Sequence, residues 1–253
     1  MIFARTYAHA DCHMVLASRF RDHLRKLGCL GPILLESTPV GVEILQPPCR
    51  APRRETEPLR LLFLSRVEKS KGIYIAIDAA ADLQSAGHSV KLTIAGDGSE
   101  RIAAEQYVLQ RRLEGIKFVG YVQGPAKVQL FADADVFLFP SNHGEGMPLS
   151  VLEAMAAGLP VICTRAGGLD NFFADQVMGY SVTEPSTAAF VSRIDMIRRD
   201  SARAGAMGKF NREYAANHFV APVVARRLFA IYDFLLSDPP SNIVPADWMN
   251  HSK

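Results

Sequence analysis

Short apolar runs alternate with amphipathic stretches from residue 59 onward, and this alternation limits the possible fold more than any other feature. The runs are nearly continuous, as in strands of a sheet covered on both faces, and the stretches between them have helical spacing. Strands are expected at residues 61–65, 90–95, 116–119, 135–140, 160–164 and 180–183, and helices at 74–86, 100–114, 126–132, from Pro148, and at 186–199, 201–218 and 220–236. Alternating strands and helices predict an α/β protein with a doubly wound parallel sheet, a Rossmann-like fold that binds ligands at the carboxyl ends of its strands.

The first 58 residues have a different pattern. Residues 11–18 and 31–36 are expected to be strands, with a helix over residues 19–28 between them. The segment that follows is rich in proline mixed with arginine and glutamate, which is typical of a linker. We therefore expect a small unit over residues 1–46, a linker over 47–58 and a large domain with C-terminal helices over 59–253.

A glycine-rich turn opens into a helix within residues 141–160. Pro148 suits the first helical turn, and Gly158 ends the helix. The free N–H groups of such a turn and the positive end of the helix dipole form an anion site suited to phosphate. Glu145 precedes the helix and Glu153 lies about one turn inside it, where carboxylates would repel a diphosphate but could bind hydroxyl groups. A diphosphate flanked by hydroxyls describes a nucleotide sugar.

Four segments together resemble one known family. They read Phe63-Leu-Ser-Arg66 followed by Lys71-Gly72, Ile94-Ala-Gly-Asp-Gly98, Phe118-Val-Gly-Tyr121, and Glu145-Gly-Met-Pro-Leu-Ser-Val-Leu-Glu153. Their order and spacing are similar to those of retaining glycosyltransferases of the GT-B fold, the family 4 type also called glycosyl transferases group 1. The resemblance covers roughly Leu59 to the C-terminus, and it implies the C-terminal, donor-binding half of a GT-B fold.

The resemblance implies transfer of a sugar from a nucleoside diphosphate sugar with retention of configuration, without a metal ion or further cofactor. Arg66 and Lys71 would contact the donor diphosphate, Glu145 would hold sugar hydroxyls near the reacting centre, and Glu153 would bind the ribose. The expected catalytic residues are Glu145, Arg66 and Lys71. The expected donor-binding residues are Gly144, Gly146, Met147, Pro148, Leu149, Glu153, Tyr121 and Val122, the last two near the base. His143 could shuttle a proton, or it could be a structural residue of the loop.

The family's first domain carries the acceptor, and the resemblance implies that residues 1–46 hold only the end of it. Residues 39–43 resemble the junction between the two domains, with Val40 where the family usually has asparagine. The expected partners are therefore a nucleotide sugar, a carbohydrate or lipid-linked acceptor, and a partner subunit that supplies the acceptor domain. Two rival hypotheses stay open. The first is a non-catalytic nucleotide-sugar-binding fragment or one subunit of a split transferase. The second, ranked last, is a nucleotide-sugar epimerase or phosphorylase of related architecture.

Composition and motif spacing argue against several other classes of protein. A net charge of +2 is too small to indicate nucleic-acid binding. The four cysteines lack the spacing of metal ligands, which favours reduced thiols in a cytoplasmic protein. No apolar run is long enough to span a bilayer, although peripheral contact with the inner membrane face stays open. Arg101 stands where a dinucleotide-binding glycine motif beginning at Gly96 needs its third glycine, so a nicotinamide site is not expected.

Overall fold

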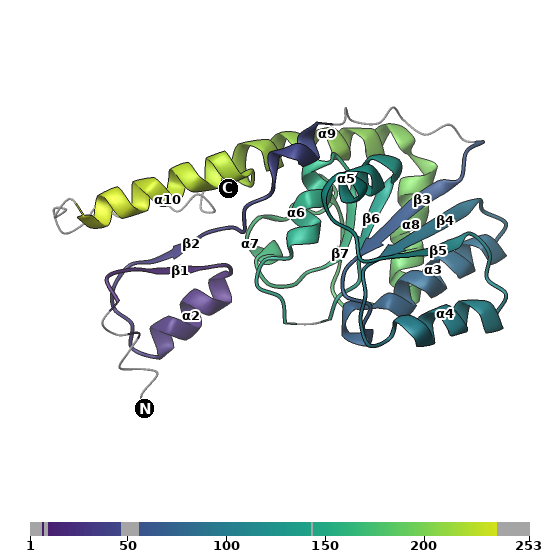
Figure 1. Cartoon of the computed structure of the whole chain (residues 1–253), viewed down its shortest axis with the longest axis horizontal. Helices are drawn as coiled ribbons and strands as arrows, with labels where there is room; N and C mark the ends of the chain where they lie inside the picture. The colour runs from purple at the N-terminus through teal and green to yellow at the C-terminus, as the bar shows by residue number, and fades with distance from the viewer. Residues whose placement is uncertain (1–6, 8–9, 47–55, 143, 237–253) are drawn as a thin grey trace.

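The computed structural model describes residues 7, 10–46, 56–142 and 144–236, and most of these residues surround one six-stranded sheet (Figure 1). Its strands are β3 (Leu59–Leu64), β4 (Val90–Ala95), β5 (Ile116–Gly120), β6 (Val136–Phe139), β7 (Val161–Thr164) and β8 (Gly179–Val182). All neighbouring strands are parallel, in the order β5-β4-β3-β6-β7-β8. This confirms the doubly wound α/β fold. The chain builds outward from β3 in one direction and from β6 in the other, so the strand order reverses between them, where such sheets bind ligands.

Helices cover both faces of this sheet, and each face has its own hydrophobic core. On one face pack α3 (Ile73–Ser85), α4 (Arg101–Gln110) and α8 (Thr187–Arg199). On the other pack α5 (Gly124–Asp133), α6 (Leu149–Ala156) and α7 (Leu169–Phe172), together with the end of α9 (Ser201–His218). The inner strands β3, β6 and β7 are almost fully buried, which explains why their sequences are nearly continuous apolar runs, whereas the edge strand β5 is half-buried.

A partly buried ion pair fixes β3 against β6 at the amino ends of the two strands. The Asp135 carboxylate accepts from Nε of Arg60 at 3.0 Å, from its terminal nitrogen at 2.7 Å and from its backbone N–H at 2.9 Å. The Asp135 N–H in turn donates to the Arg60 carbonyl at 2.8 Å. Because β3 and β6 lie far apart in the sequence, this reciprocal clamp helps to hold the two strands that carry the candidate site.

A smaller unit precedes the sheet and consists of β1 (His13–Val15), α2 (Ser18–Lys26) and β2 (Ile33–Leu35). Its two strands pair in parallel, as a strand–helix–strand unit requires. A short 3-10 helix, η1 (Val42–Leu45), follows it, and the long helix α10 (Ala221–Leu236) runs back alongside it (Figure 1). Val40 bridges Val220, so the start of α10 is joined to the segment after β2.

Helix α10 is anchored to the smaller unit by one arginine. Arg227 donates to both carboxylate oxygens of Glu36, at 2.5 and 3.1 Å, and to the carbonyl of His218 at 2.7 Å. The Glu36 side chain is 7% exposed. The last helix is therefore shared between the two units. The expected domain boundaries stay a prediction, and most of the expected linker, residues 47–55, lies outside the described residues.

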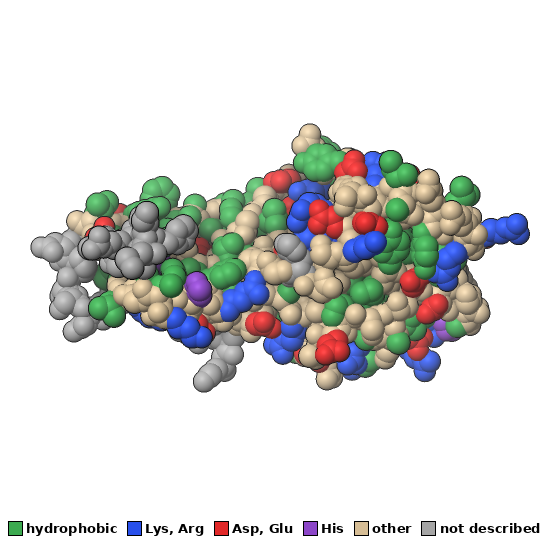
Figure 2. All heavy atoms as spheres, turned by 90° about the horizontal axis from the view of Figure 1, so that it is seen from below, with side chains coloured by type: hydrophobic (Ala, Val, Ile, Leu, Met, Phe, Trp, Pro, Cys, Tyr) green, Lys and Arg blue, Asp and Glu red, His purple; other side chains and the backbone are tan. Residues whose placement is uncertain are grey.

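Several local details differ from the sequence-based expectation, and the strand expected over residues 11–18 is shorter, at His13–Val15. Pro148 is the N-cap of α6, with φ −74° and ψ 100°, rather than a residue of its first turn. The one-turn helix α7 was not expected because four residues are too few to show helical spacing. In the face drawn in Figure 2, acidic and basic side chains are mixed over the described surface. Among the described residues, no helix is both long and apolar enough to cross a membrane.

Candidate functional site

Lys71 lies at the carboxyl end of β3, where a short 3-10 helix, η2 (Lys69–Lys71), leads into α3. Gly72 follows in the left-handed conformation, with φ +76°, and a side chain there would run into the Pro140 carbonyl at the end of β6. Glycine is therefore required both by conformation and by the close approach of two backbones. This packing buries Lys71, which is only 6% exposed, between the ends of β3 and β6.

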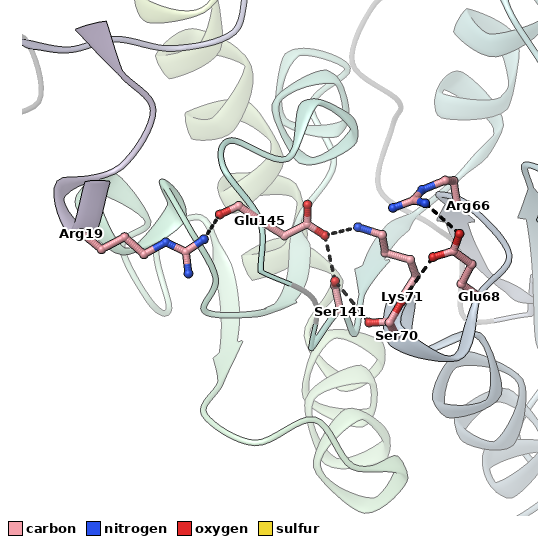
Figure 3. Close-up of polar contacts among 7 residues, drawn as sticks. All are labelled: Arg19, Arg66, Glu68, Ser70, Lys71, Ser141 and Glu145. Atoms are coloured by element: carbon pink, nitrogen blue, oxygen red, sulfur yellow. Dashed lines mark hydrogen bonds and ion pairs between the residues drawn. The ribbon is translucent and has the colours of Figure 1, made fainter. Parts of the chain in front are cut away.

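The Glu145 carboxylate meets Lys71 in this position (Figure 3). Nζ of Lys71 lies 2.5 Å from Oε1 of Glu145, and Oγ of Ser141 donates to the same oxygen at 2.9 Å. The side chains of the ion pair are 7% and 14% exposed, and Ser141 is fully buried. The N–H of Asn142 donates to the Ser70 carbonyl at 3.0 Å, which ties the loop after β6 to η2. Two residues that the sequence placed at a donor site are thus in direct contact.

Arg66 is arranged differently from Lys71. Its guanidinium donates to Glu68 at 2.8 Å, its side chain is 60% exposed, and it lies on the Lys71 side of Glu145 (Figure 3). The other Glu68 oxygen accepts from the Ser70 hydroxyl at 3.3 Å. Arg66 is therefore held by a surface ion pair, which is a weak interaction that an anionic ligand can displace.

The loop before α6 carries backbone N–H groups that can bind an anion. Among the described residues, the N–H groups of Leu149 and Ser150 have no hydrogen-bond acceptor, as expected for the first turn of a helix. The Gly168 N–H donates to the Gly146 carbonyl at 2.6 Å, which supports the loop from the turn after β7. Gly167 has φ +62°, and a side chain there would collide with the carbonyls of Glu145 and Gly146.

The smaller unit also contacts this loop. Arg19 of α2 donates to the Glu145 carbonyl (Figure 3). Leu16 packs so closely that a side-chain carbon at Gly146 would lie 3.1 Å from it. Ser18 donates its N–H to the side chain of Asn171 at 3.4 Å. Residues from both units therefore position the backbone around Glu145.

Glu153 lies on the second turn of α6 and is ion-paired with a residue of another helix. Nζ of Lys127, in the first half of α5, lies 2.6 Å from Oε1 of Glu153. The Glu153 side chain is 8% exposed and that of Lys127 is 26% exposed. Burial raises the pKa of the Glu153 carboxyl above its usual range, and the hydrogen bond and charge of Lys127 oppose this rise.

The remaining predicted residues differ in how far they are exposed. Met147 is buried, Leu149 is 38% exposed and Gly144 is exposed. Tyr121, after β5, is 74% exposed and Val122 is half-buried, so neither side chain is packed into the core. His143 lies outside the described residues. Among the described residues, no cluster of His, Cys, Asp and Glu side chains could hold a metal ion.

Three residues of the site were not identified from the sequence: Ser141, Lys127 and Arg19. Ser141 directly follows the expected strand, so its position at a strand end was a usable signal. Lys127 and Arg19 reach the site from helices that only the folded structure brings next to α6. Together, the cations of Lys71, Arg66 and Lys127, the carboxylates of Glu145 and Glu153, and the N–H groups of Leu149 and Ser150 can bind an anion with hydroxyl groups on either side.

Comparison with protein families gives one match, which extends over residues 50–214 and carries the description glycosyl transferases group 1. Among curated proteins, the chain is 29% identical over 226 residues to a glycogen synthase of Mycobacterium tuberculosis, covering 88% of the chain and 54% of that protein. It is 26% identical over 228 residues to the amylovoran biosynthesis glycosyltransferase AmsK of Erwinia amylovora, covering 84% of the chain and 56% of that protein. The chain therefore spans little more than half the length of these relatives.

Solved structures give the same fold. A sucrose-phosphate synthase from Thermosynechococcus elongatus superposes with a TM-score of 0.80 and 25% identity, covering 94% of the chain and 61% of that protein. Anabaena HepE in complex with UDP-glucose superposes with a TM-score of 0.73 and 19% identity, covering 88% of the chain and 64% of that protein. The superposition confirms the expected C-terminal half of a GT-B fold.

Proposed function

Because the chain belongs to the glycosyl transferases group 1 family, we propose that it transfers a sugar from a nucleoside diphosphate sugar to an acceptor with retention of configuration. The observation that carries this proposal is the contact between Lys71 and Glu145 at the point where the strand order of the sheet reverses. It combines a phosphate-binding cation with a carboxylate suited to sugar hydroxyls. The chain spans only part of the length of its relatives, so the activity of a complete enzyme is itself part of what we propose.

The donor diphosphate binds, in this proposal, between Lys71 and the start of α6. The N–H groups of Leu149 and Ser150 and the positive end of the helix dipole bind one phosphate. Lys71 breaks its ion pair with Glu145 and binds the other phosphate. Arg66 leaves Glu68 and adds a bidentate contact, which an exposed ion pair permits at little cost. These groups stabilise the negative charge that develops on the departing diphosphate, and no metal ion is needed for that task.

The sugar and the ribose occupy the two ends of this anion site. Glu145, released from Lys71, accepts hydrogen bonds from sugar hydroxyls next to the reacting carbon, and Glu153 accepts them from the ribose. Met147, Pro148 and the glycines of the loop shape its floor, while Tyr121 and Val122 lie near the base. The binding of UDP-glucose by the structural neighbour HepE supports a nucleotide sugar as donor here.

The acceptor is, in this proposal, a carbohydrate or a lipid-linked carbohydrate. The smaller unit has two parallel strands, and parallel sheets this small are marginal in isolation. We therefore propose that further acceptor-side structure, in the same polypeptide or in a partner subunit, completes the enzyme. The reaction would take place in the cytoplasm, with peripheral contact at the inner membrane face for a lipid-linked acceptor. The same incomplete unit favours one alternative, a chain that binds the donor but does not transfer sugar alone.

Thermal unfolding with UDP, GDP and ADP, each alone and as its sugar derivative, tests donor binding. A ligand at about 100 times its dissociation constant stabilises the fold by roughly 2.7 kcal/mol, a shift of several degrees. We expect a shift for one base, reduced in Glu153→Ala because nucleotide binding weakens, whereas Glu145→Ala should retain nucleotide binding and mainly reduce transfer. The anomeric configuration of the first product, read by NMR, tests retention. Absence of any shift in a cooperatively folding sample would contradict the proposal.

A further inference from the structure

The ion pair between Lys127 and Glu153 connects the two helices that begin beside the proposed nucleotide. Helix α5 starts directly after the loop that holds Tyr121 and Val122, near the proposed base position. Helix α6 starts at the loop proposed to hold the diphosphate. A ribose lies between base and diphosphate in any nucleotide. The 2.6 Å contact from Nζ of Lys127 to Oε1 of Glu153 joins the two helices about one turn after the start of each.

The two carboxylate oxygens of Glu153 have different roles in this arrangement. Oε1 accepts from Lys127, and within residues 10–46, 56–142 and 144–236 no other group is hydrogen-bonded to the carboxylate. Glu153 itself is 6% exposed. An ionised carboxylate accepts hydrogen bonds and donates none, and its charge makes the bond that Oε2 accepts from a hydroxyl stronger than the bond a neutral carboxyl would form. A buried carboxylate needs a partner to stay charged.

Lys127 is the cation that faces Glu153. Helix η1 contributes Glu43, whose charge raises the pKa of the Glu153 carboxyl further. Strands β6 and β7, which pack against α6, carry no charged residue, and Arg212 of α9 donates to the Leu45 carbonyl. Among the described surroundings, Lys127 alone therefore opposes both burial and the charge of Glu43.

We propose that Lys127 is a positioning residue of the donor site: it fixes Oε1 of Glu153 and keeps the carboxylate charged, so that Oε2 accepts from a ribose hydroxyl. This inference rests on the proposed function, since it needs a ribose at Glu153. It assigns to a residue of α5 a part in distinguishing ribonucleotides from 2′-deoxynucleotides. The contact requires a cation at position 127, because a neutral side chain of the same length leaves the carboxylate buried and unpaired.

The first test uses the ligand-free protein and follows the carboxyl carbon of Glu153 by NMR, assigned by its loss in Glu153→Gln. Lys127→Met should raise the titration midpoint of Glu153 by at least about one pH unit, because an opposite charge lowers a carboxyl pKa by about one to three. Lys127→Arg should restore the wild-type midpoint. The control Lys209→Met removes an exposed lysine 4.0 Å from Glu213 on α9 and should leave it unchanged. An unchanged midpoint in Lys127→Met would overturn the inference.

The second test measures binding by calorimetry between about pH 5.5 and pH 8.5. The probe is whichever of UDP, GDP and ADP the wild-type protein selects, together with its 2′-deoxy form. A hydrogen bond to a charged group corresponds to a preference for the ribonucleotide of about tenfold or more. As the pH falls, a carboxyl with a higher pKa is protonated first. Lys127→Met should therefore lose this preference at a higher pH than the wild type does, and Lys127→Arg should follow the wild type.

The outcomes separate this inference from the proposed function. If the wild type binds none of the three nucleotides, the proposed function fails and the inference fails with it. If the wild type binds but Lys127→Met keeps its pH profile and preference, only the inference fails. Equal weakening at every pH with an unchanged preference would show that Lys127 contacts the diphosphate directly, which also overturns it. Should Lys127→Met not fold, Lys127→Gln is read in the same way.

Discussion

Replacing Lys71 with methionine should destabilise the fold, because it leaves the Glu145 carboxylate without its counter-ion. The side chains of Lys71 and Glu145 are 7% and 14% exposed, so the change strands a largely buried carboxylate whose remaining partner is the Ser141 hydroxyl at 2.9 Å. Removing one member of a buried ion pair costs about 3–5 kcal/mol. The serine contact and the slight exposure of Glu145 favour the lower end, about 3 kcal/mol, which is a large part of a typical stability of about 5–15 kcal/mol.

A double variant isolates the cause of this loss. Lys71→Met combined with Glu145→Gln leaves no buried charge at the site, so it should be more stable than Lys71→Met alone. Contacting residues couple by about 0.5–3 kcal/mol, and we expect about 2 kcal/mol here. Urea unfolding measures all four proteins of the cycle, with unchanged m values as the control for two-state behaviour. The single variant should unfold roughly 6–12 °C below the wild type.

Binding should not recover together with stability. The double variant lacks both the phosphate cation and the carboxylate, so its affinity for the nucleoside diphosphate should stay about 10–100-fold weaker than that of the wild type. Stability equal to the wild type in Lys71→Met, or a double variant whose loss equals the sum of the two single losses, would refute the reasoning about the buried charge. Full binding by the folded double variant would refute the assignment of the site.

Three further predictions concern the scaffold. Gly72→Ala forces a left-handed alanine against the Pro140 carbonyl, so urea unfolding should show a loss of at least about 2 kcal/mol. Asp135→Ala strands Arg60, with its side chain and its N–H both left unpaired, and the same assay should show a loss of about 2–3 kcal/mol. Burial raises the pKa of the Cys163 thiol, so an aromatic disulfide reagent should react with it only as fast as the native state opens.

Matched controls distinguish these effects from general damage. Glu213→Gln removes an exposed ion pair on α9, so its stability should stay within about 0.5 kcal/mol of the wild type. Gly87→Ala tests the left-handed conformation without a collision, because φ is +83° and no atom lies within 4 Å of the added carbon. It should cost less than Gly72→Ala, and an equal cost would remove the contact with Pro140 from the argument. For the thiol, rapid labelling of Cys163 in native buffer would contradict its burial.

The elements of the large unit could be predicted from the sequence because they follow from local patterns. The six strands were expected within two residues of their observed ends, since a run of apolar residues between turns is recognisable locally. The helix after Glu145 was expected from its proline and its glycine terminator for the same reason. Helices too short to show a period, such as η2 and α7, carried no such signal and were missed.

The partners of the site residues could not be predicted in the same way. Lys127 lies in a segment with a helical pattern, and such a pattern does not tell whether a lysine faces solvent or a carboxylate of another helix. Arg19 lies more than a hundred positions from the loop that it contacts. The direction of Arg66 depends on Glu68, two residues away, but two side chains so close in sequence can meet or diverge according to the turn between them.

The sequence by itself determined the class of fold, the order of its elements and which of their ends carry glycine, cations and carboxylates, because hydrophobic period and turn chemistry are local properties of a chain. Only the tertiary structure decided that β3 and β6 are neighbours and that the strand order reverses there, which brings Lys71 against Glu145. It also decided that Lys127 is the counter-ion of Glu153. Such pairings depend on how strands and helices pack across the whole sheet, and the free energy of packing is a property of the assembled core rather than of any segment.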